Sequence, residues 1–96
     1  MIAIAVTVNI FADKVELFEN VTRELEAAVL ANEPDCVVYR MSKSRSRPLT
    51  YINMEIFRDQ AALDRHMAAD YFLDAVGRMS GCMSGEPDIH FLDTLV

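Results

Sequence analysis

The chain begins with an alternation of apolar and smaller or polar residues that predicts a β-strand. Over residues 2–10, Ile and Val recur at every second position, and Ala, Thr and Asn fill the positions between them. A period of two places the branched side chains on one face of a strand. The same alternation returns over residues 49–57. There Ile52, Met54 and Ile56 share one face, and the other face carries Tyr51, Asn53, Glu55 and Phe57.

Residues 14–31 change to a helical period. Apolar side chains recur there at spacings of three and four, with charged side chains between them. This pattern predicts an amphipathic helix that packs one face on a sheet. Asp13 and Glu16 have the spacing of a capping box at its start, and Pro34 predicts its end.

The remaining segments supply two more strands and a second helical region. Residues 36–41 and 88–95 are predicted strands. Asp59 is the predicted N-cap of a helix over 60–68, and Asp70 that of a helix over 71–80. Gly81 and the Gly85-Glu86-Pro87 segment close the helical region.

The resulting βαββαβ order, on one domain spanning residues 1–96, predicts an α+β fold of the ferredoxin-like class. In this class, helices cover one face of a four-stranded antiparallel sheet. The other face is bare, yet both faces of the first and third predicted strands carry apolar groups. A second copy of the same sheet would hide the bare face, so we expect a homodimer.

Composition narrows the range of partners. Hydrophobic residues make up 52% of the chain, and its net charge is −6. The negative net charge argues against binding the phosphate backbone of a nucleic acid. Residues 49–55 also lack the glycine and the basic residue of an RNA-recognition strand, so we expect no nucleic-acid partner.

Targeting and metal signals are missing as well. The N-terminus has no basic n-region and no stretch is long enough to span a membrane, so the expectation is a cytoplasmic protein without membrane contact. Two cysteines and two histidines lie far apart in the sequence. No metal site is therefore predicted.

Four stretches along the chain carry a family resemblance. A strand runs directly into a helix over 8–18, and residues 32–39 hold a Glu-Pro-Asp-Cys turn with a tyrosine beyond it. Residues 55–63 read Glu-x-Phe-x-Asp, and residues 66–72 read His-x-x-x-x-x-Phe. In this order and spacing they resemble the antibiotic-biosynthesis-monooxygenase family of dimeric α+β barrels.

The resemblance implies a homodimer whose two sheets form a barrel, with a ligand pocket between sheet and helices in each subunit. It also implies several activities: cofactor-free oxygenation of polyphenols and quinols, haem degradation, and isomerisation of small sugar-like phosphates. Phe57 stands where the family usually has tryptophan. The haem-degrading branch has tryptophan at the position of His66 and its haem-ligating histidine at that of Val76, so haem breakdown is disfavoured and no cofactor is predicted.

His66 is the candidate catalytic residue. It lies on the same helix face as Ala62 and Leu63, which should point inward. A histidine at the edge of an apolar pocket can act as a general base. The competing interpretation is a hydrogen-bonded histidine that holds its helix to a strand.

Five further side chains are candidates for binding an aromatic substrate: Tyr51, Met54, Phe57, Tyr71 and Phe72. The alternatives are core packing for the phenylalanines and Met54, and a place at the dimer seam for the tyrosines. Glu55 is expected to form an ion pair with Arg40 of the neighbouring strand, either across the strand pair or across the dimer interface.

The leading functional hypothesis is cofactor-independent oxygenation of a small aromatic molecule, a polyphenol or quinol. A non-catalytic ligand-binding or dimerisation module, and an isomerase of the same fold, are the alternatives.

Overall fold

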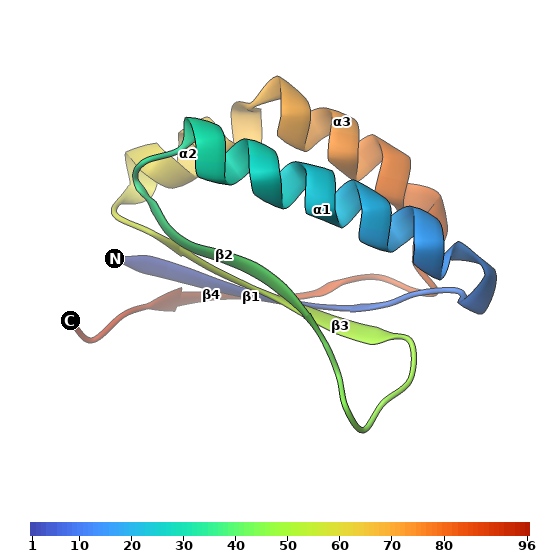
Figure 1. The fold of residues 1–96 in the computed structure, drawn as a ribbon. Coiled ribbons are helices and arrows are strands. Elements are labelled where there is room, and N and C mark those ends of the chain that lie inside the picture. The colour runs from blue at the N-terminus through green and yellow to red at the C-terminus, as the bar shows by residue number, and fades with distance from the viewer.

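Four strands and three helices follow one another in the predicted order in the computed structural model, which describes residues 1–96. The elements are β1 (Ile2–Asn9), α1 (Val15–Asn32), β2 (Cys36–Lys43), β3 (Thr50–Phe57), α2 (Gln60–Ala68), α3 (Asp70–Met79) and β4 (Asp88–Asp93). Two short 3₁₀ turns, η1 (Ala12–Lys14) and η2 (Ser80–Cys82), precede α1 and follow α3. All three helices lie on one side of the sheet (Figure 1). The α+β ferredoxin-like class is confirmed.

The strand order in the sheet is β2-β3-β1-β4, and every neighbouring pair is antiparallel. The first strand therefore lies at the centre, and the last strand forms one edge. Ile4 of β1 stands opposite Glu55 of β3 on one side and opposite Phe91 of β4 on the other. Because residues directly opposite each other point to the same face, these three side chains share the helix-covered face.

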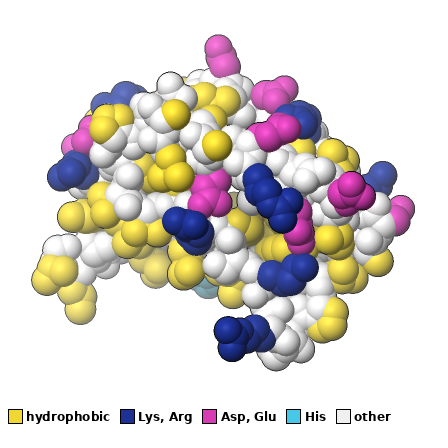
Figure 2. Space-filling view, in the orientation of Figure 1, with side chains coloured by type: hydrophobic (Ala, Val, Ile, Leu, Met, Phe, Trp, Pro, Cys, Tyr) yellow, Lys and Arg dark blue, Asp and Glu magenta, His cyan; other side chains and the backbone are white.

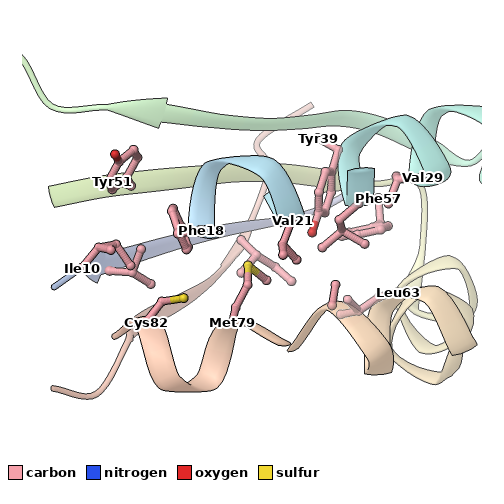
Figure 3. Close-up of a cluster of buried hydrophobic side chains, with 14 of the residues drawn as sticks. Ile10, Phe18, Val21, Val29, Tyr39, Tyr51, Phe57, Leu63, Met79 and Cys82 are labelled. Atoms are coloured by element: carbon pink, nitrogen blue, oxygen red, sulfur yellow. The ribbon is translucent and has the colours of Figure 1, made fainter. Parts of the chain in front are cut away.

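The core lies between this face and the helices (Figure 3). Phe18, Val21 and Val29 of α1 are buried there, at the spacing of the predicted apolar stripe. Phe57 of β3 and Cys82 after α3 are also inaccessible to solvent. In this layer, the apolar side chains that recur about every 3.6 residues along α1 pack on those that recur every two residues along the strands.

The opposite face of the sheet carries no helix (Figure 1) and is mainly apolar, with Arg40 of β2 and His90 of β4 on its outer strands. Ile52 and Met54 of β3 are 39% and 48% exposed on it. Val38 of β2 and Leu92 of β4 point the same way, since they pair with positions of that parity. The predicted bare face is therefore present, and the homodimer that would cover it stays a prediction.

The predicted capping residues have mixed outcomes. The Oδ1 atom of Asp59 accepts a hydrogen bond of 2.8 Å from the amide of Ala62, which confirms the N-cap of α2. The capping box at Asp13 is wrong, because the chain makes the turn η1 first and the Lys14 amide bonds to the Phe11 carbonyl at 2.9 Å.

The cap predicted at Asp70 is also wrong. A single extended residue, Ala69, separates α2 from α3, so Asp70 already lies in the first turn of α3 and its side chain makes no capping bond. The Ala69 carbonyl accepts from the amide of Leu73.

The expected ion pair of Glu55 with Arg40 is contradicted. The register places Tyr39 opposite Glu55, and Arg40 opposite Met54. Arg40 lies on the edge strand β2, and its Nε atom is 3.2 Å from a carboxylate oxygen of Glu26 on α1. Glu55 is instead buried beneath the helices.

Charged and hydrophobic side chains are interspersed on the face shown in Figure 2, and the apolar C-terminal end of the chain projects from the body. Leu95 and Val96 at that end are fully exposed. None of the three helices has both the length and the apolar content that a membrane span requires.

Candidate functional site

A cavity of about 290 Å³ lies between the sheet and the helices, on the side of β4. Its walls are mainly apolar and include Ile4 of β1, Phe91 of β4, and Phe72 and Val76 of α3. The position agrees with the pocket that the family resemblance implies. Cavities of this size with few polar groups are typical of small-molecule sites.

Two polar side chains from β3 enter this cavity. Asn53 and Glu55 are two residues apart on the strand, so both point to the helix-covered face, and both are buried. The Nδ2 atom of Asn53 donates a hydrogen bond of 2.9 Å to Oε2 of Glu55. Burial raises the pKa of the Glu55 carboxyl, although nearby His66 and the Asn53 amide act in the opposite direction.

His66 reaches the cavity from α2 and is 1% exposed. Its position three residues after Leu63 places it on the buried face of the helix, as predicted. Three aromatic rings surround the imidazole, with centroid distances of 5.2 Å to Tyr39, 5.1 Å to Phe57 and 4.6 Å to Phe72.

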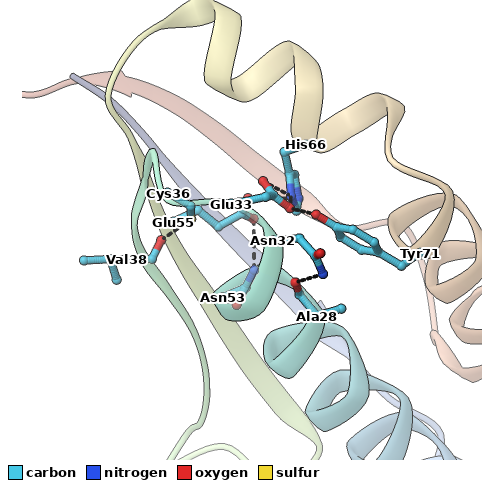
Figure 4. Close-up of polar contacts among 9 residues, drawn as sticks. All are labelled: Ala28, Asn32, Glu33, Cys36, Val38, Asn53, Glu55, His66 and Tyr71. Atoms are coloured by element: carbon cyan, nitrogen blue, oxygen red, sulfur yellow. Dashed lines mark hydrogen bonds and ion pairs between the residues drawn. The ribbon is translucent and has the colours of Figure 1, made fainter.

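One nitrogen of the His66 ring has a partner and the other has none. The Nδ1 atom lies 3.0 Å and 3.1 Å from the two carboxylate oxygens of Glu33 (Figure 4). A carboxylate only accepts hydrogen bonds, so Nδ1 carries a hydrogen, and in the neutral form of the ring the lone pair is on Nε2. Nε2 has no hydrogen-bond partner, and the nearest acidic oxygen, Oε1 of Glu55, is 3.9 Å away. This arrangement is that of an oriented base facing an apolar cavity.

Glu33 connects the histidine to a second hollow on the outside of the protein. It follows the last residue of α1, where its amide bonds to the Val29 carbonyl. The Tyr71 hydroxyl also donates to the Glu33 carboxylate (Figure 4). Burial and this bond raise the pKa of Tyr71. Glu33 and Tyr71 line the outer hollow, which has a volume of about 360 Å³.

Cys36 also lines the outer hollow. Burial, and next the charge of Glu33, raise the pKa of its thiol to about 11. The thiol therefore stays protonated at neutral pH, and a thiolate nucleophile is not available here. No three His, Cys, Asp or Glu side chains of the chain are grouped as metal ligands.

The structure brings four of the six predicted site residues together. Phe57 and Phe72 pack against His66, and Tyr71 reaches the same histidine through Glu33. Phe72 lines the cavity, whereas Phe57 lies behind the ring and is inaccessible to solvent. The roles of these residues in binding or catalysis stay predictions.

Tyr51 and Met54 lie elsewhere. The Tyr51 hydroxyl donates a hydrogen bond of 2.5 Å to Glu19 of α1, and burial and this bond raise its pKa to about 12. It borders a surface hollow beside Lys43 and Arg23. Met54 points to the bare face of the sheet. Neither side chain contributes to the cavity that contains His66.

Three residues of this site were not among the predicted site residues: Asn53, Glu55 and Glu33. Asn53 could have been found, because a polar side chain on the strand face shared by Tyr51 and Phe57 is a sign of a buried polar group. Glu33 gave no such signal. It is one of several acidic residues near a helix end, and only the fold brings it to His66, 33 positions further along the chain.

Comparisons with known proteins agree with this architecture. The family model for antibiotic biosynthesis monooxygenase matches residues 1–78. A solved structure from Caulobacter crescentus CB15, provisionally named an antibiotic biosynthesis monooxygenase, is 35% identical to this chain. The match covers 99% of this chain and 90% of that one, with a TM-score of 0.96. The chain belongs to the antibiotic biosynthesis monooxygenase family.

More distant structures share the fold alone. A protein from Nitrosomonas europaea with a similar provisional name is 18% identical, with 100% of both chains covered and a TM-score of 0.90. A conserved protein from Methanosarcina mazei Go1 is 24% identical, with 95% and 89% covered and a TM-score of 0.90. No curated protein sequence matches the chain.

Proposed function

We propose that this protein is a cofactor-independent monooxygenase that oxidises a small, electron-rich aromatic molecule, a polyphenol or quinol, in the cavity beneath its helices. The observation that carries the proposal is the Nε2 atom of His66, which is buried at the cavity without a hydrogen-bond partner while Glu33 holds Nδ1. Family membership supports the same class of reaction.

In the proposed reaction, Nε2 of His66 accepts the proton of a phenolic hydroxyl. The phenolate gives one electron to dioxygen, and the resulting radical and superoxide combine at a ring carbon to form a peroxide. Loss of the hydrogen on that carbon and cleavage of the O–O bond release water and leave a quinone. One oxygen atom enters the product and the other leaves as water, so dioxygen is the only oxidant required.

The residues around His66 would assist this chemistry in different ways. The carboxylate of Glu33 stabilises the imidazolium that forms when Nε2 takes up a proton. Phe72 offers an aromatic face beside the base. The apolar cavity walls exclude water from the charged intermediates.

The test is oxygen uptake by the purified protein with a panel of quinols, compared with the His66→Ala and His66→Gln variants. General-base catalysis contributes about 10²–10⁴-fold, so both variants should lose most of the turnover. His66→Gln keeps an amide that can donate to Glu33, which separates loss of the base from loss of the fold. Unchanged turnover in folded variants would remove His66 from the mechanism.

A non-catalytic ligand-binding module is the second candidate. The hydrogen bond from His66 to Glu33 ties α2 to the end of α1, and this alone would account for a buried histidine. If the protein is such a module, a ligand should raise the midpoint of its thermal unfolding, and the protein should consume no oxygen in the presence of that ligand. An isomerase of phosphorylated sugars is disfavoured, because no lysine or arginine lines the cavity to hold a phosphate.

The homodimer belongs to the same proposal. A second copy of the chain is the partner that suits the bare face, since a contact across a two-fold axis pairs the same apolar patch of both subunits. Val38, Ile52, Met54 and Leu92 would form the contact. A cytoplasmic location is part of the proposal as well, supported by two cysteines that are both free thiols.

A further inference from the structure

Two carboxyl groups approach the His66 ring, one at each nitrogen (Figure 4). Glu33 accepts hydrogen bonds from Nδ1 and from the Tyr71 hydroxyl. Oε1 of Glu55 lies 3.9 Å from Nε2, and both side chains line the inner cavity. The hydrogen bond that the Glu55 carboxyl accepts comes from Asn53 and ends at Oε2. Oε1 is therefore free to carry a hydrogen and to donate it to a molecule in the cavity.

The surroundings of Glu55 favour this protonated form. Its side chain is 9% exposed, and no lysine or arginine lines the cavity to offset a negative charge. Burial is the main cause of the raised pKa of this carboxyl, and the charge of Glu33 acts in the same direction. His66 and the Asn53 amide act in the opposite direction. Because the neutral ring carries no charge, the effect of His66 begins only when the ring takes up a proton.

The other elements packed around Glu55 bring no cation to it. β2 places Tyr39 directly opposite, and Cys36 lies further along the same strand. Burial raises the pKa of both side chains, so both are neutral at pH 7. β1 and β4 contribute Ile4 and Phe91, and α3 lines the cavity with apolar side chains. A protonated carboxyl group and a neutral imidazole thus share one cavity, which is the combination of an acid and a base.

The proposed oxygenation needs an acid after the peroxide has formed. The O–O bond breaks as the ring hydrogen is removed from the carbon that carries the peroxide. The departing oxygen must receive a proton in order to leave as water. His66 cannot supply that proton, because in the same step its Nε2 atom accepts the ring hydrogen.

We propose that Glu55 is the general acid of this reaction and gives the hydrogen on its Oε1 atom to the oxygen that leaves as water. This inference rests on the proposed oxygenase function and adds a second catalytic residue to it. The geometry suits the role, because one oxygen atom between Nε2 of His66 and Oε1 of Glu55 can be about 2.8 Å from each.

The protons and electrons balance over the cycle. Nε2 of His66 first takes the phenolic proton and returns it to the peroxide anion. Nε2 then removes the ring hydrogen, whose bonding electrons form the new C=O bond while the O–O electrons go to the departing oxygen. Glu55 protonates that oxygen, and water leaves. A proton finally passes from Nε2 to Oε1, directly or through the product water, and both groups regain their starting forms.

The test is the fate of the oxygen consumed by the Glu55→Gln variant. Glutamine keeps the size of the side chain and an acceptor for Asn53, but it has no proton to transfer. The probe is 1,5-dihydroxynaphthalene, which reacts with one dioxygen to give a hydroxynaphthoquinone and water. Loss of a general acid slows its step about 10²–10⁴-fold, so the peroxide should revert and release superoxide. Most of the oxygen consumed should then be recovered as hydrogen peroxide, formed when superoxide disproportionates.

Glu26→Gln is the matched control. It makes the same chemical change in a carboxylate of α1 that is bound to Arg40, away from the cavity. Its ratio of hydrogen peroxide to quinone should equal that of the wild type. In the wild type this ratio should rise with pH as Glu55 ionises, whereas in the Glu55→Gln variant it should be high at every pH. A purely structural role of Glu55 would not make the ratio depend on pH in this way.

A second measurement needs no turnover. The infrared spectrum of the wild-type protein at neutral pH should contain the carbonyl band of a protonated carboxyl group. This band should be missing from the Glu55→Gln variant and present in the Glu26→Gln control. A wild-type protein without the band overturns the inference, since an ionised Glu55 has no proton to give.

The outcomes separate this inference from the proposed function. A ratio of hydrogen peroxide to quinone that is the same in Glu55→Gln and the wild type removes Glu55 as the acid and leaves the oxygenase in place. If the wild-type protein takes up no oxygen with this probe or with any quinol of the panel, the oxygenase is removed and the acid with it.

Discussion

The Nδ1 atom of His66 lies 3.0 Å from Oε2 of Glu33, so the first helix ends in a carboxylate that orients a side chain of the second. The pair lies between two hollows, with Glu33 lining the outer one and Nε2 of His66 facing the inner one. The negative charge of Glu33, on the solvent side of the ring, therefore balances the positive charge that the ring gains when Nε2 takes up a proton.

Replacing Glu33 by Gln tests this relationship. An amide can present either a donor or an acceptor to Nδ1, so the ring loses its fixed tautomer. Turnover should fall by at least about tenfold, and a wrong tautomer can cost roughly 10⁴-fold. Oxygen uptake and the ¹⁵N resonances of the His66 ring are the measurements.

Tyr71→Phe is the control for that variant, because it removes a second donor to Glu33 and leaves the Glu33–His66 bond in place. Its effect should be the smaller of the two. Equal losses in both variants would mean that Glu33 acts on the fold of this region and not on the base.

A charge placed at Met54 should separate the proposed dimer. Met54→Lys places an ammonium group at the centre of the bare face, where a second sheet would bury it at a cost of several kcal/mol. Leu30→Lys, on the exposed side of α1, is the matched control. Size-exclusion chromatography with light scattering at micromolar concentration should give a monomer for the first variant and a dimer for the second. A wild-type monomer would refute the dimer itself.

Glu55→Gln should make the protein more stable at neutral pH. Burial raises the pKa of this carboxyl above its ordinary value of 4.5, so the folded state disfavours the ionised form. The contribution of Glu55 to stability is therefore full below about pH 4.5 and is lost as the pH rises through the raised pKa. Thermal midpoints of variant and wild type should coincide in acid and diverge toward neutral pH, with the variant higher. A constant difference at all pH values would contradict this explanation.

Tyr51→Phe should weaken the fold. The hydroxyl donates to Glu19, whose side chain is 23% exposed, so its loss should cost about 1 kcal/mol. The Tyr51 bond, and next Lys43, lower the pKa of Glu19, so this stabilisation is present at neutral pH and is lost as the pH falls through the lowered pKa. Urea denaturation at neutral and acidic pH measures both effects. A cost that does not decline in acid would exclude the proposed partner.

Local patterns along the chain were sufficient to predict the fold. Alternation over 2–10 and the helical period over 14–31 each predicted which side chains are buried, whereas alternation over 49–57 predicted only which side chains share a face. The inward position of His66 followed from the same rule. Helix starts were harder to predict, because a 3₁₀ turn before α1 and a one-residue link before α3 satisfy the amides that Asp13 and Asp70 were expected to cap.

The partners of the polar residues in the site depend on the register of the strands and on contacts between segments that are distant in the sequence. A local sequence pattern predicts neither of these. Glu55 and Arg40 have opposite charges on neighbouring strands, yet a β-bulge near Cys36 and the pairing of β2 with β3 place Tyr39 beside Glu55. Met54 was grouped with the ligand residues because its strand face could not be assigned. The helices cover the strand face that carries Asn53 and Glu55, so Met54 lies on the opposite, bare face.

The central place of β1 has a consequence for how the chain acquires its shape. β1 pairs with residues 50–57 on one side and with residues 88–93 on the other, so both of its neighbours are synthesised long after it. Such distant pairing slows folding relative to helical domains of similar size. Until residues 88–93 have been made, one hydrogen-bonding edge of β1 has no partner strand and the cavity lacks the wall that β4 provides.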